Sequence, residues 1–174
     1  YRTNEGETFK VLKGVSFSVD ESQIFVILGP SGSGKTTILR LINRLEDPEE
    51  GRIYFDGEDV KNLNPLKLRK KIGMIFQIPA LFDGAVKDNV SYSLRLNRYK
   101  KDEIEKKVLE YLKIVGLGEG FSSRNVRTLS VGEQHKVSIA RTLINDPEVL
   151  LMDEPTSSLD PTSTKVILEL VNEL

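Results

Sequence analysis

The sequence of 174 residues contains no cysteine. This absence excludes disulfides, thiolate metal sites and cysteine nucleophiles, and it makes a reducing cytoplasm the simplest compartment. The chain also lacks an excess of either charge, because 25 Lys and Arg residues nearly balance 26 Asp and Glu residues. A neutral balance gives no electrostatic case for nucleic acid as the main partner, although a local basic patch stays open. We therefore expect no nucleic-acid partner.

Long apolar runs are absent as well. No run approaches the length of about 20 residues that crosses a bilayer, and we expect no secretory leader. If the protein works at a membrane, another protein must hold it there. Hydrophobic residues make up 39% of the chain and charged residues 29%. This is an ordinary balance for one globular domain with a sizeable core.

The first half of the chain contains the pattern of a strand, a glycine-rich loop and a helix. Val15–Val19 alternates apolar and polar residues, which predicts a half-buried strand. Ile24–Leu28 is continuously apolar and predicts a strand buried on both faces, as in a parallel sheet. Glycines follow at once, and Thr37–Leu45 has a helical pattern. This order is the context that a phosphate-binding loop requires.

Further strands and one loop are predicted in the next segment. Arg52–Phe55 reads as a strand, and Asp56-Gly57 is a turn that could close a hairpin. Ile72–Phe76 is a short apolar strand, whereas Gln77–Gly84 reads as a loop.

The second half is mostly helical. Lys101–Val115 predicts an amphipathic helix whose charged residues form a solvated face, and its apolar positions are Ile104, Val108, Leu112 and Val115. A helix is expected from near Ser130 to about Leu143, a buried strand over Val149–Met152 and a last helix over Thr162–Leu174. Together these elements predict an α/β fold with a helical insertion between about Gln77 and Arg127.

Gly29–Thr36 fits the pattern G-x-x-x-x-G-K-[ST] in full. Glycines permit positive φ and let the backbone approach phosphates, while successive N–H groups and the start of the following helix attract an anion. Lys35 is expected to reach the β- and γ-phosphates, and the Thr36 hydroxyl to ligate Mg²⁺. This motif predicts binding of Mg-ATP.

Asp153 and Glu154 follow the apolar run Val149–Met152 directly. Acidic residues at the carboxyl end of a buried strand lie where α/β sheets bind ligands. Asp153 would hold Mg²⁺, directly or through water, and Glu154 would polarise the attacking water or take its proton.

The third element is the segment Leu129–Gln134, which reads Leu-Ser-Val-Gly-Glu-Gln. Taken by itself, it predicts a serine N-cap at Ser130 that opens a helix. A hydroxyl and a glycine at a helix start can also bind an anion.

This ordered set of motifs resembles the nucleotide-binding subunits of ATP-binding-cassette transporters over nearly the whole chain. The resemblance implies a P-loop NTPase with a mostly parallel sheet, an N-terminal antiparallel β subdomain, a nucleotide-binding core over 1–76 and 128–174 and a helical subdomain over about 77–127. Leu129–Gln134 resembles the family's signature loop, with Ser130 and Gly132 at its phosphate-contacting positions. Ser158-Leu159-Asp160 resembles the family's aspartate loop.

The resemblance also assigns the remaining site residues. Gln77 matches a glutamine that can ligate Mg²⁺, and Tyr1 is the best candidate to stack on adenine, with Phe9 as the alternative. The predicted nucleotide contacts are Tyr1, Gly29, Pro30, Ser31, Gly32, Ser33, Gly34, Lys35, Thr36, Thr37, Gln77, Ser130, Gly132, Gln134 and Asp160; the magnesium ligands are Thr36, Gln77 and Asp153; the catalytic residue is Glu154.

In that family two copies enclose two ATP molecules, and the phosphate loop of one copy faces the signature of the other. The resemblance therefore implies two kinds of partner, a second copy of this chain and membrane-spanning transporter subunits. It places the protein at the cytoplasmic face of a membrane, as a peripheral ATPase.

The sequence departs from the family pattern in two places. Val131 stands where the signature usually has glycine, and Glu133 where it usually has glutamine, so we expect a working but retuned signature. The family's γ-phosphate histidine and final strands would follow Leu174. The single histidine, His135, lies in the helix after the signature, where a surface or interhelical role is expected. We accordingly expect nucleotide binding with weak turnover.

The particular system stays open. Phe76–Gly84 with Asn89-Val90 resembles a subgroup near the phosphate-import ATPases, and also ATPases of iron-export and plant aluminium-tolerance systems. The segment would line the groove for a membrane partner's coupling helix, or Leu81 and Phe82 would simply join a core. Alternative functions are a DNA-maintenance ATPase, which would need a long coiled-coil insertion, a ribosome-acting cassette ATPase and a non-catalytic nucleotide sensor.

Overall fold

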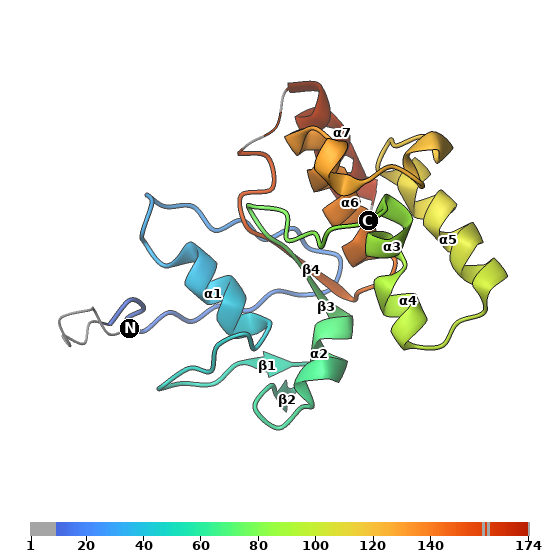
Figure 1. The fold of residues 1–174 in the computed structure, drawn as a ribbon. Helices are drawn as coiled ribbons and strands as arrows, with labels where there is room; N and C mark the ends of the chain where they lie inside the picture. Colours follow the sequence, from blue (N-terminus) through green and yellow to red (C-terminus); the bar gives the residue numbers. More distant parts are fainter. Residues whose placement is uncertain (1–9, 158, 160, 174) are drawn as a thin grey trace. The chain divides into compact units, whose positions relative to one another are not determined.

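The structure is a computed structural model that describes residues 10–157, 159 and 161–173. The chain divides into two compact units, Tyr1–Lys61 and Asn62–Leu174. The first contains the glycine-rich loop, a helix and a hairpin. The second contains a parallel strand pair and the remaining helices (Figure 1).

The helix of the first unit, α1 (Lys35–Ile42), begins directly after the glycine-rich loop. A hairpin follows, in which β1 (Tyr54–Phe55) pairs antiparallel with β2 (Glu58–Asp59). Its two turn residues both have positive φ, 49° at Asp56 and 77° at Gly57. This is the conformation that Asp-Gly favours in a two-residue hairpin turn. The predicted hairpin is therefore confirmed, with strands shorter than the sequence indicated.

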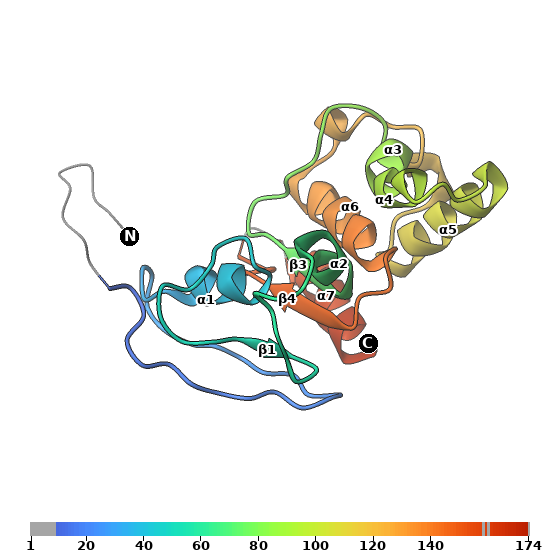
Figure 2. The ribbon, with the colours of Figure 1, turned by 90° about the horizontal axis from the view of Figure 1, so that it is seen from below.

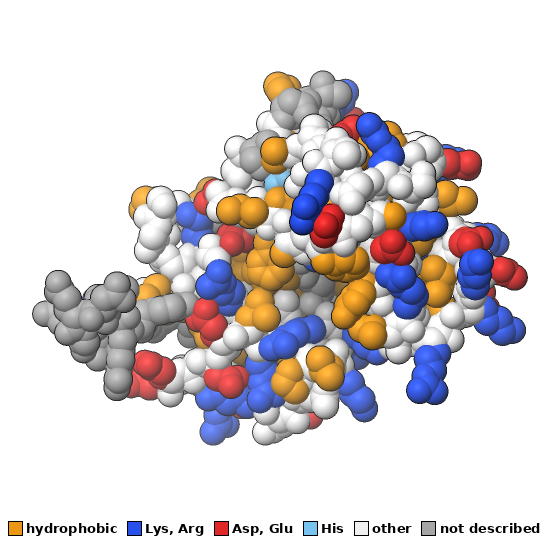
Figure 3. Space-filling view, in the orientation of Figure 1, with side chains coloured by type: hydrophobic (Ala, Val, Ile, Leu, Met, Phe, Trp, Pro, Cys, Tyr) orange, Lys and Arg blue, Asp and Glu red, His pale blue; other side chains and the backbone are white. Residues whose placement is uncertain are grey.

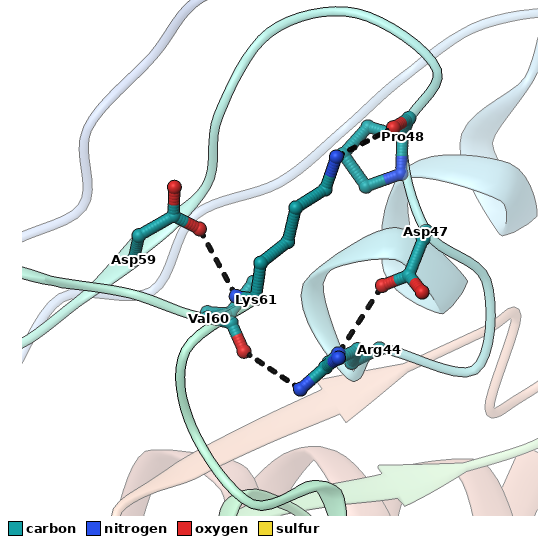
Figure 4. Close-up of polar contacts among 6 residues, drawn as sticks. All are labelled: Arg44, Asp47, Pro48, Asp59, Val60 and Lys61. Carbon is teal, nitrogen blue, oxygen red and sulfur yellow. Dashed lines mark hydrogen bonds and ion pairs between the residues drawn. The ribbon is translucent and has the colours of Figure 1, made fainter.

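Polar contacts join the segment after α1 to the segment after the hairpin (Figure 4). The Arg44 guanidinium donates to the carbonyl of Val60 and to the carboxylate of Asp47, both at 3.2 Å. The Lys61 ammonium donates to the carbonyl of Pro48 at 2.9 Å. The Val60 side chain is buried. These bonds fix the path of the chain from α1 to the hairpin.

The two strands expected before the glycine-rich loop are not found. Val15–Val19 and Ile24–Leu28 have no strand assignment, and their apolar side chains are exposed, up to 87% for Leu28, except that of the half-buried Ile27. An apolar strand needs hydrogen-bonded neighbours and cover on both faces. Residues 10–61 contain only the two short strands of the hairpin, so the first unit supplies neither. The prediction of a half-buried and a fully buried strand is wrong for this structure.

The second unit is built on a parallel pair, β3 (Ile72–Ile75) and β4 (Val149–Met152). Ile72 pairs with Val149 and Ile75 with Met152. All four residues of β3 are buried, whereas only Leu151 is fully buried in β4. Both strands were predicted, although β4 is less buried than expected. Their register brings the residues that follow Ile75 and Met152 to the same edge of the sheet.

Helix α6 (Val131–Leu143) packs against β3 and carries much of the core of this unit (Figure 2). Helix α5 (Lys101–Ile114) packs beside α6 through the predicted apolar positions, of which Val108 and Leu112 are fully buried. Its charged side chains are exposed apart from that of Lys107, which is half-buried, and Figure 3 shows acidic and basic groups interspersed over this helix. The solvated charged face of the predicted amphipathic helix is confirmed.

Several short helices complete the unit. They are α2 (Pro65–Lys71), α3 (Val86–Val90), α4 (Tyr92–Leu96), the 3₁₀ turns η1 (Glu119–Phe121) and η2 (Val126–Thr128), and the last helix α7 (Pro161–Glu173). The sequence reasoning did not identify α2, whose N-cap Asn64 accepts from the N–H groups of Leu66 and Lys67. Asn followed by Pro at the first helical position was the available signal.

The loop before α3 is fixed by a buried amide. Asn89 accepts from the N–H of Phe82 at 3.1 Å and donates to the carbonyl of Phe82 at 3.0 Å.

Within the described residues, no helix is both long and apolar enough to span a membrane.

Candidate functional site

The glycine-rich loop has the conformation that a phosphate-binding loop needs. Gly32 and Gly34 have φ of 76° and 96°, in the left-handed region that favours glycine. A Cβ at Gly34 would approach the Leu12 side chain to 2.8 Å. Glycine at this position therefore serves both the backbone angle and the packing of residues 11–12. Gly34 is also the N-cap of α1, so the first N–H groups of the helix lie at the loop.

The Lys35 side chain bonds back to the start of this loop. Its ammonium donates to the carbonyls of Gly29 and Pro30, both at 3.0 Å. The loop therefore holds the positive charge of Lys35 beside several backbone N–H donors, and this arrangement attracts phosphate. Thr36 and Thr37 follow in the first turn of α1 and are half-buried. Pro30, Ser31 and Ser33 form the rest of the loop, with the Ser33 N–H donating to the Pro30 carbonyl at 3.3 Å.

Gln77, Asp153 and Glu154 lie together in the second unit, at the ends of β3 and β4. The Asp153 N–H donates to the Ile75 carbonyl at 3.0 Å, which extends the pairing past the strands. The Gln77 amide donates to the Glu154 carboxylate at 3.0 Å. Asp153 is 7% exposed, whereas Gln77 and Glu154 are exposed. At this edge of the sheet the Asp153 carboxylate is therefore buried and the Glu154 carboxylate faces solvent.

Glu154 has an uncommon backbone. Its φ is 47°, in the left-handed region that costs a non-glycine residue about 1–2 kcal/mol. The bend is held by Ser157, whose hydroxyl and N–H both donate to the Glu154 carbonyl, at 3.0 and 3.1 Å. Strain of this kind gathers at functional positions, where it aims a side chain.

Ser130 and Glu133 form a reciprocal cap at the start of α6. The Glu133 N–H donates to the Ser130 hydroxyl at 3.3 Å, and the Ser130 N–H donates to the Glu133 carboxylate at 2.7 Å. The predicted N-cap at Ser130 is confirmed. The sequence reasoning missed the role of Glu133, although Ser-x-x-Glu is the signature of this capping box.

The other signature residues lie around this cap. Gly132 is half-buried in the first turn, and Val131 is 54% exposed. The Gln134 amide donates to the Leu129 carbonyl at 3.1 Å, so this side chain bonds the main chain of its own segment.

His135 lies in the second turn of α6 and is 1% exposed. Of the two roles expected for it, the surface role is therefore wrong and the interhelical one agrees with its burial in the core. Burial lowers the pKa of His135 below its ordinary value, and a hydrogen bond with the main chain of Gln77 opposes this shift.

Three predicted positions fall outside the described residues. Tyr1 and its alternative Phe9 precede residue 10, and Asp160 lies in a gap of the described range. Of the predicted aspartate loop, Leu159 is described and packs against the core of the second unit.

Among the described residues, no three His, Cys, Asp or Glu side chains gather into a metal site. Mg²⁺ does not need such a cage, because it usually takes one or two carboxylates together with substrate phosphates and water. Asp153 and Gln77 carry side-chain oxygens at one edge of the sheet of the second unit, and Thr36 carries a hydroxyl beside the phosphate loop of the first unit. Their chemistry therefore fits a magnesium ion that arrives with a nucleotide.

The loop, the helix behind it and the acidic sheet edge define a P-loop nucleotide-binding protein. The chain belongs to the ABC transporter family, as its ATP-binding domain, because the sequence model of that family matches residues 12–157. The family expected from the motifs is thus confirmed.

Curated relatives extend this assignment. The chain is 45% identical over 165 residues to ABC transporter I family member 17 of Arabidopsis thaliana and 45% identical over 173 residues to Protein STAR1 of Oryza sativa. It is 46% identical over 169 residues to the methionine import ATP-binding protein MetN of Clostridioides difficile. These alignments cover 95%, 99% and 95% of this chain but only 62%, 49% and 52% of the relatives. The chain therefore spans about half to three fifths of their length.

Solved structures agree on the fold. CbiO1 of Clostridium perfringens, described as part of the transporter complex cbiONQ, gives a TM-score of 0.85 at 34% identity and covers 99% of this chain and 69% of that chain. The cassette MJ0796, in a dimeric post-hydrolysis state with ADP and Pi, gives 0.81 at 37% identity over 92% of this chain and 73% of that chain. The predicted P-loop NTPase fold is confirmed. The division into a core and a helical subdomain stays a prediction.

Proposed function

We propose that this chain binds Mg-ATP and hydrolyses it, as the nucleotide-binding part of a transporter. The observation that carries the proposal is the Gln77–Glu154 hydrogen bond of 3.0 Å at the edge formed by β3 and β4. It places a solvent-exposed carboxylate beside an amide at the end of the sheet, next to the buried Asp153. A nucleotide held by Gly29–Thr36 would be the substrate of that pair.

The phosphate loop supplies binding and charge neutralisation. The Lys35 ammonium already lies over the loop carbonyls of Gly29 and Pro30, and its charge would stabilise the β- and γ-phosphates. N–H groups at the start of α1 would donate to the same oxygens. The remaining loop positions, Ser31, Gly32, Ser33 and Gly34, and the following Thr36 and Thr37 would contact the phosphates with backbone or hydroxyl groups.

Glu154 would act on the attacking water. Its left-handed backbone and the two bonds from Ser157 hold the carboxylate at the sheet edge. There it would orient the water and accept its proton, while Gln77 keeps the carboxylate in place. Mg²⁺, held by Thr36, Asp153 and Gln77 when ATP binds, would neutralise charge on the phosphates.

We infer that two copies act together, with Ser130 and Gly132 of one copy contacting the nucleotide of the other. The signature begins α6 with an exposed serine, which suits contact with an outside anion. Gln134, Tyr1 and Asp160 would complete the nucleotide contacts. The cassette MJ0796 is dimeric in two solved structures, which supports the pairing of two copies.

Membrane-spanning subunits are the second proposed partner, at the cytoplasmic face of a membrane. Exposed apolar side chains follow β3 and lie on the short helix α4, namely Ile78 and Phe82 after the strand and Tyr92 and Leu96 on the helix. Such side chains would receive a helix of the membrane subunit. A phosphate or metal-related system is the proposal from the sequence, whereas several relatives carry the name methionine import ATP-binding protein. Uptake assays with the partner subunits would decide between these solutes.

The test of the proposed function is the variant Glu154→Gln. If Glu154 removes the proton from water, the variant should bind Mg-ATP, hydrolyse it much more slowly and accumulate as an ATP-bound dimer. Light scattering with and without Mg-ATP measures the dimer, and Glu148→Gln, at an exposed acid that pairs with Lys71, is the matched control. An unchanged mass with Mg-ATP, together with wild-type turnover in Glu154→Gln, would refute the proposal.

A further inference from the structure

Two neighbouring segments of the second unit carry a concentration of positive charge. Helix α2 (Pro65–Lys71) contains four Lys or Arg residues and no acidic residue. Residues 95–101, from the end of α4 to the first residue of α5, contain four more, again without Asp or Glu. All eight basic side chains are exposed. The net charge of the whole chain is −1, so this concentration is local and does not follow from overall composition.

The two segments form one surface. The Lys70 ammonium donates to the side-chain oxygen of Asn97 at 2.6 Å, which joins α2 to the residue that follows α4. Leu68 of α2 and Leu94 of α4 are buried and anchor the two helices in the unit. Figure 3 shows Lys and Arg side chains over α2 and near the end of α4. We call the eight basic side chains of residues 65–71 and 95–101 the basic patch.

Acidic neighbours neutralise only part of the basic patch. Asp102 and Glu103 follow it directly in the first turn of α5, where Glu103 accepts from the Lys100 N–H at 3.2 Å. Three further acidic residues form ion pairs nearby, namely Asp88 with Arg95, Glu148 with Lys71 and Asp146 with Lys107. In the part of the chain that the structure describes, the patch residues without an ion pair include Lys67, Arg98 and Lys101. The patch therefore keeps a net positive charge, which attracts anions.

Exposed apolar side chains alternate with these charges. Leu66, which precedes Lys67, is 72% exposed, and Leu96 of α4 is 67% exposed. Tyr92 and Tyr99 are exposed as well. A purely electrostatic surface for nucleic acid has no use for exposed leucines, because a phosphate backbone offers no apolar layer. Leucine and tyrosine beside Lys and Arg instead suit the boundary between lipid headgroups and acyl chains.

We propose that the basic patch binds the anionic headgroups of a lipid bilayer. The negative potential of a cytoplasmic leaflet attracts clustered Lys and Arg, and Leu66 and Leu96 would enter the headgroup region between them. Tyr92 and Leu96 also belong to the surface proposed for the membrane subunit, so the lipid contact would continue that surface. The inference rests on the proposed place of the protein at a membrane and adds a direct contact between this chain and lipid.

Sedimentation with vesicles tests the contact without nucleotide or partner. The wild type should sediment with vesicles of three parts phosphatidylcholine to one part phosphatidylglycerol, and not with phosphatidylcholine alone. Raising the salt from about 0.1 M to about 1 M shortens the screening length from about 10 Å to about 3 Å, so it should release most of the protein. Equal sedimentation with both kinds of vesicle, or with neither, would overturn the inference.

A matched pair of double variants locates the contact on the patch. Lys67→Glu with Lys101→Glu should weaken binding to the mixed vesicles roughly tenfold or more. Lys106→Glu with Lys113→Glu changes the net charge equally at two exposed lysines of α5 and should bind like wild type. Equal losses in the two variants would assign binding to overall charge and overturn the inference. Lys67→Gln with Lys101→Gln replaces the first variant if circular dichroism shows that it fails to fold.

Two further measurements separate this surface from other anion sites. Saturating Mg-ATP should not release the protein from the vesicles, because the phosphate loop belongs to the first unit and the patch to the second. Tight binding to double-stranded DNA that Lys67→Glu with Lys101→Glu abolishes, without vesicle binding, would make the patch a nucleic-acid surface and overturn the inference. Vesicle binding by a wild type that shows no ATP turnover would refute the proposed catalysis alone.

Discussion

The side-chain amide of Gln77 donates to the carboxylate of Glu154 at 3.0 Å, although the two residues are 77 positions apart in the sequence. The parallel register of β3 and β4 explains the meeting. Ile75 pairs with Met152, and the bond from the Asp153 N–H to the Ile75 carbonyl carries the pairing one step further. The two side chains therefore owe their contact to the pairing of β3 with β4.

Gln77→Ala should slow ATP hydrolysis about tenfold or more while leaving nucleotide binding measurable. The reason is that Glu154 keeps its carboxylate but loses the amide that orients it. Phosphate release at saturating Mg-ATP gives kcat, and titration with a non-hydrolysable analogue gives the affinity. Gln23→Ala, at an exposed glutamine that bonds Asp20, is the control. A normal kcat in Gln77→Ala would contradict the proposed orientation of Glu154.

Gly73→Ala should destabilise the protein by about 1–3 kcal/mol, because the added methyl group overpacks the contact between β3 and α6. A Cβ at this position would lie 2.7 Å from Cγ2 of Thr142 and 3.2 Å from Cγ of Pro147. Thr142 cannot simply rotate away, since its hydroxyl donates to the Ser138 carbonyl at 3.0 Å. Urea unfolding followed by circular dichroism measures the loss.

Two further variants test that explanation. Gly120→Ala is the matched control, because a Cβ there meets no atom within 4 Å. Thr142→Ser removes the obstructing methyl group and keeps the hydroxyl, so it should recover part of the stability of Gly73→Ala. Equal costs at Gly73 and Gly120 would argue against the overpacking.

Tyr111 should make stability fall in strongly alkaline solution. Burial raises the pKa of Tyr111 well above its ordinary value, and the hydrogen bond that its hydroxyl donates to Asp146 adds to this effect. An acid with a raised folded-state pKa loses its proton first in the unfolded state. Its stabilising effect is therefore complete below about pH 10, the ordinary pKa of tyrosine, and is lost as the pH rises further.

The measurement is the difference in unfolding free energy between wild type and Tyr111→Phe, at pH 8 and near pH 11. The wild type should be the more stable at pH 8, and the difference should shrink near pH 11. Taking a difference removes the contribution of lysines, which titrate in both proteins. A difference that stays constant with pH would contradict the raised pKa.

The sequence predicted those parts of the molecule whose signal is local. The hairpin turn at Asp56-Gly57, the apolar stripe of α5, the serine cap of α6 and the short strands β3 and β4 all follow from residue type and spacing. The motif at Gly29–Thr36 likewise predicted that glycines of the loop adopt positive φ and that a helix begins there.

The contacts between distant segments could not be predicted in this way. Nothing local to Gln77 indicates a bond to Glu154, and nothing local to His135 indicates that its side chain is buried. The failure at Ile24–Leu28 has the same origin. An apolar run predicts burial only if other segments cover it, and four of these five side chains are exposed in the first unit.

The central claim is that Gly29–Thr36 binds the phosphates of ATP through Lys35, and calorimetric titration of Mg-ATP into wild type and Lys35→Ala tests it most directly. Lys10→Ala, at an exposed lysine of the same unit that pairs with Glu50, is the control. Loss of a charged hydrogen bond costs about 1.5–3 kcal/mol, so the affinity of Lys35→Ala should fall roughly tenfold to a hundredfold while Lys10→Ala binds like wild type. Equal affinity in wild type and Lys35→Ala, or no binding to wild type, would contradict it.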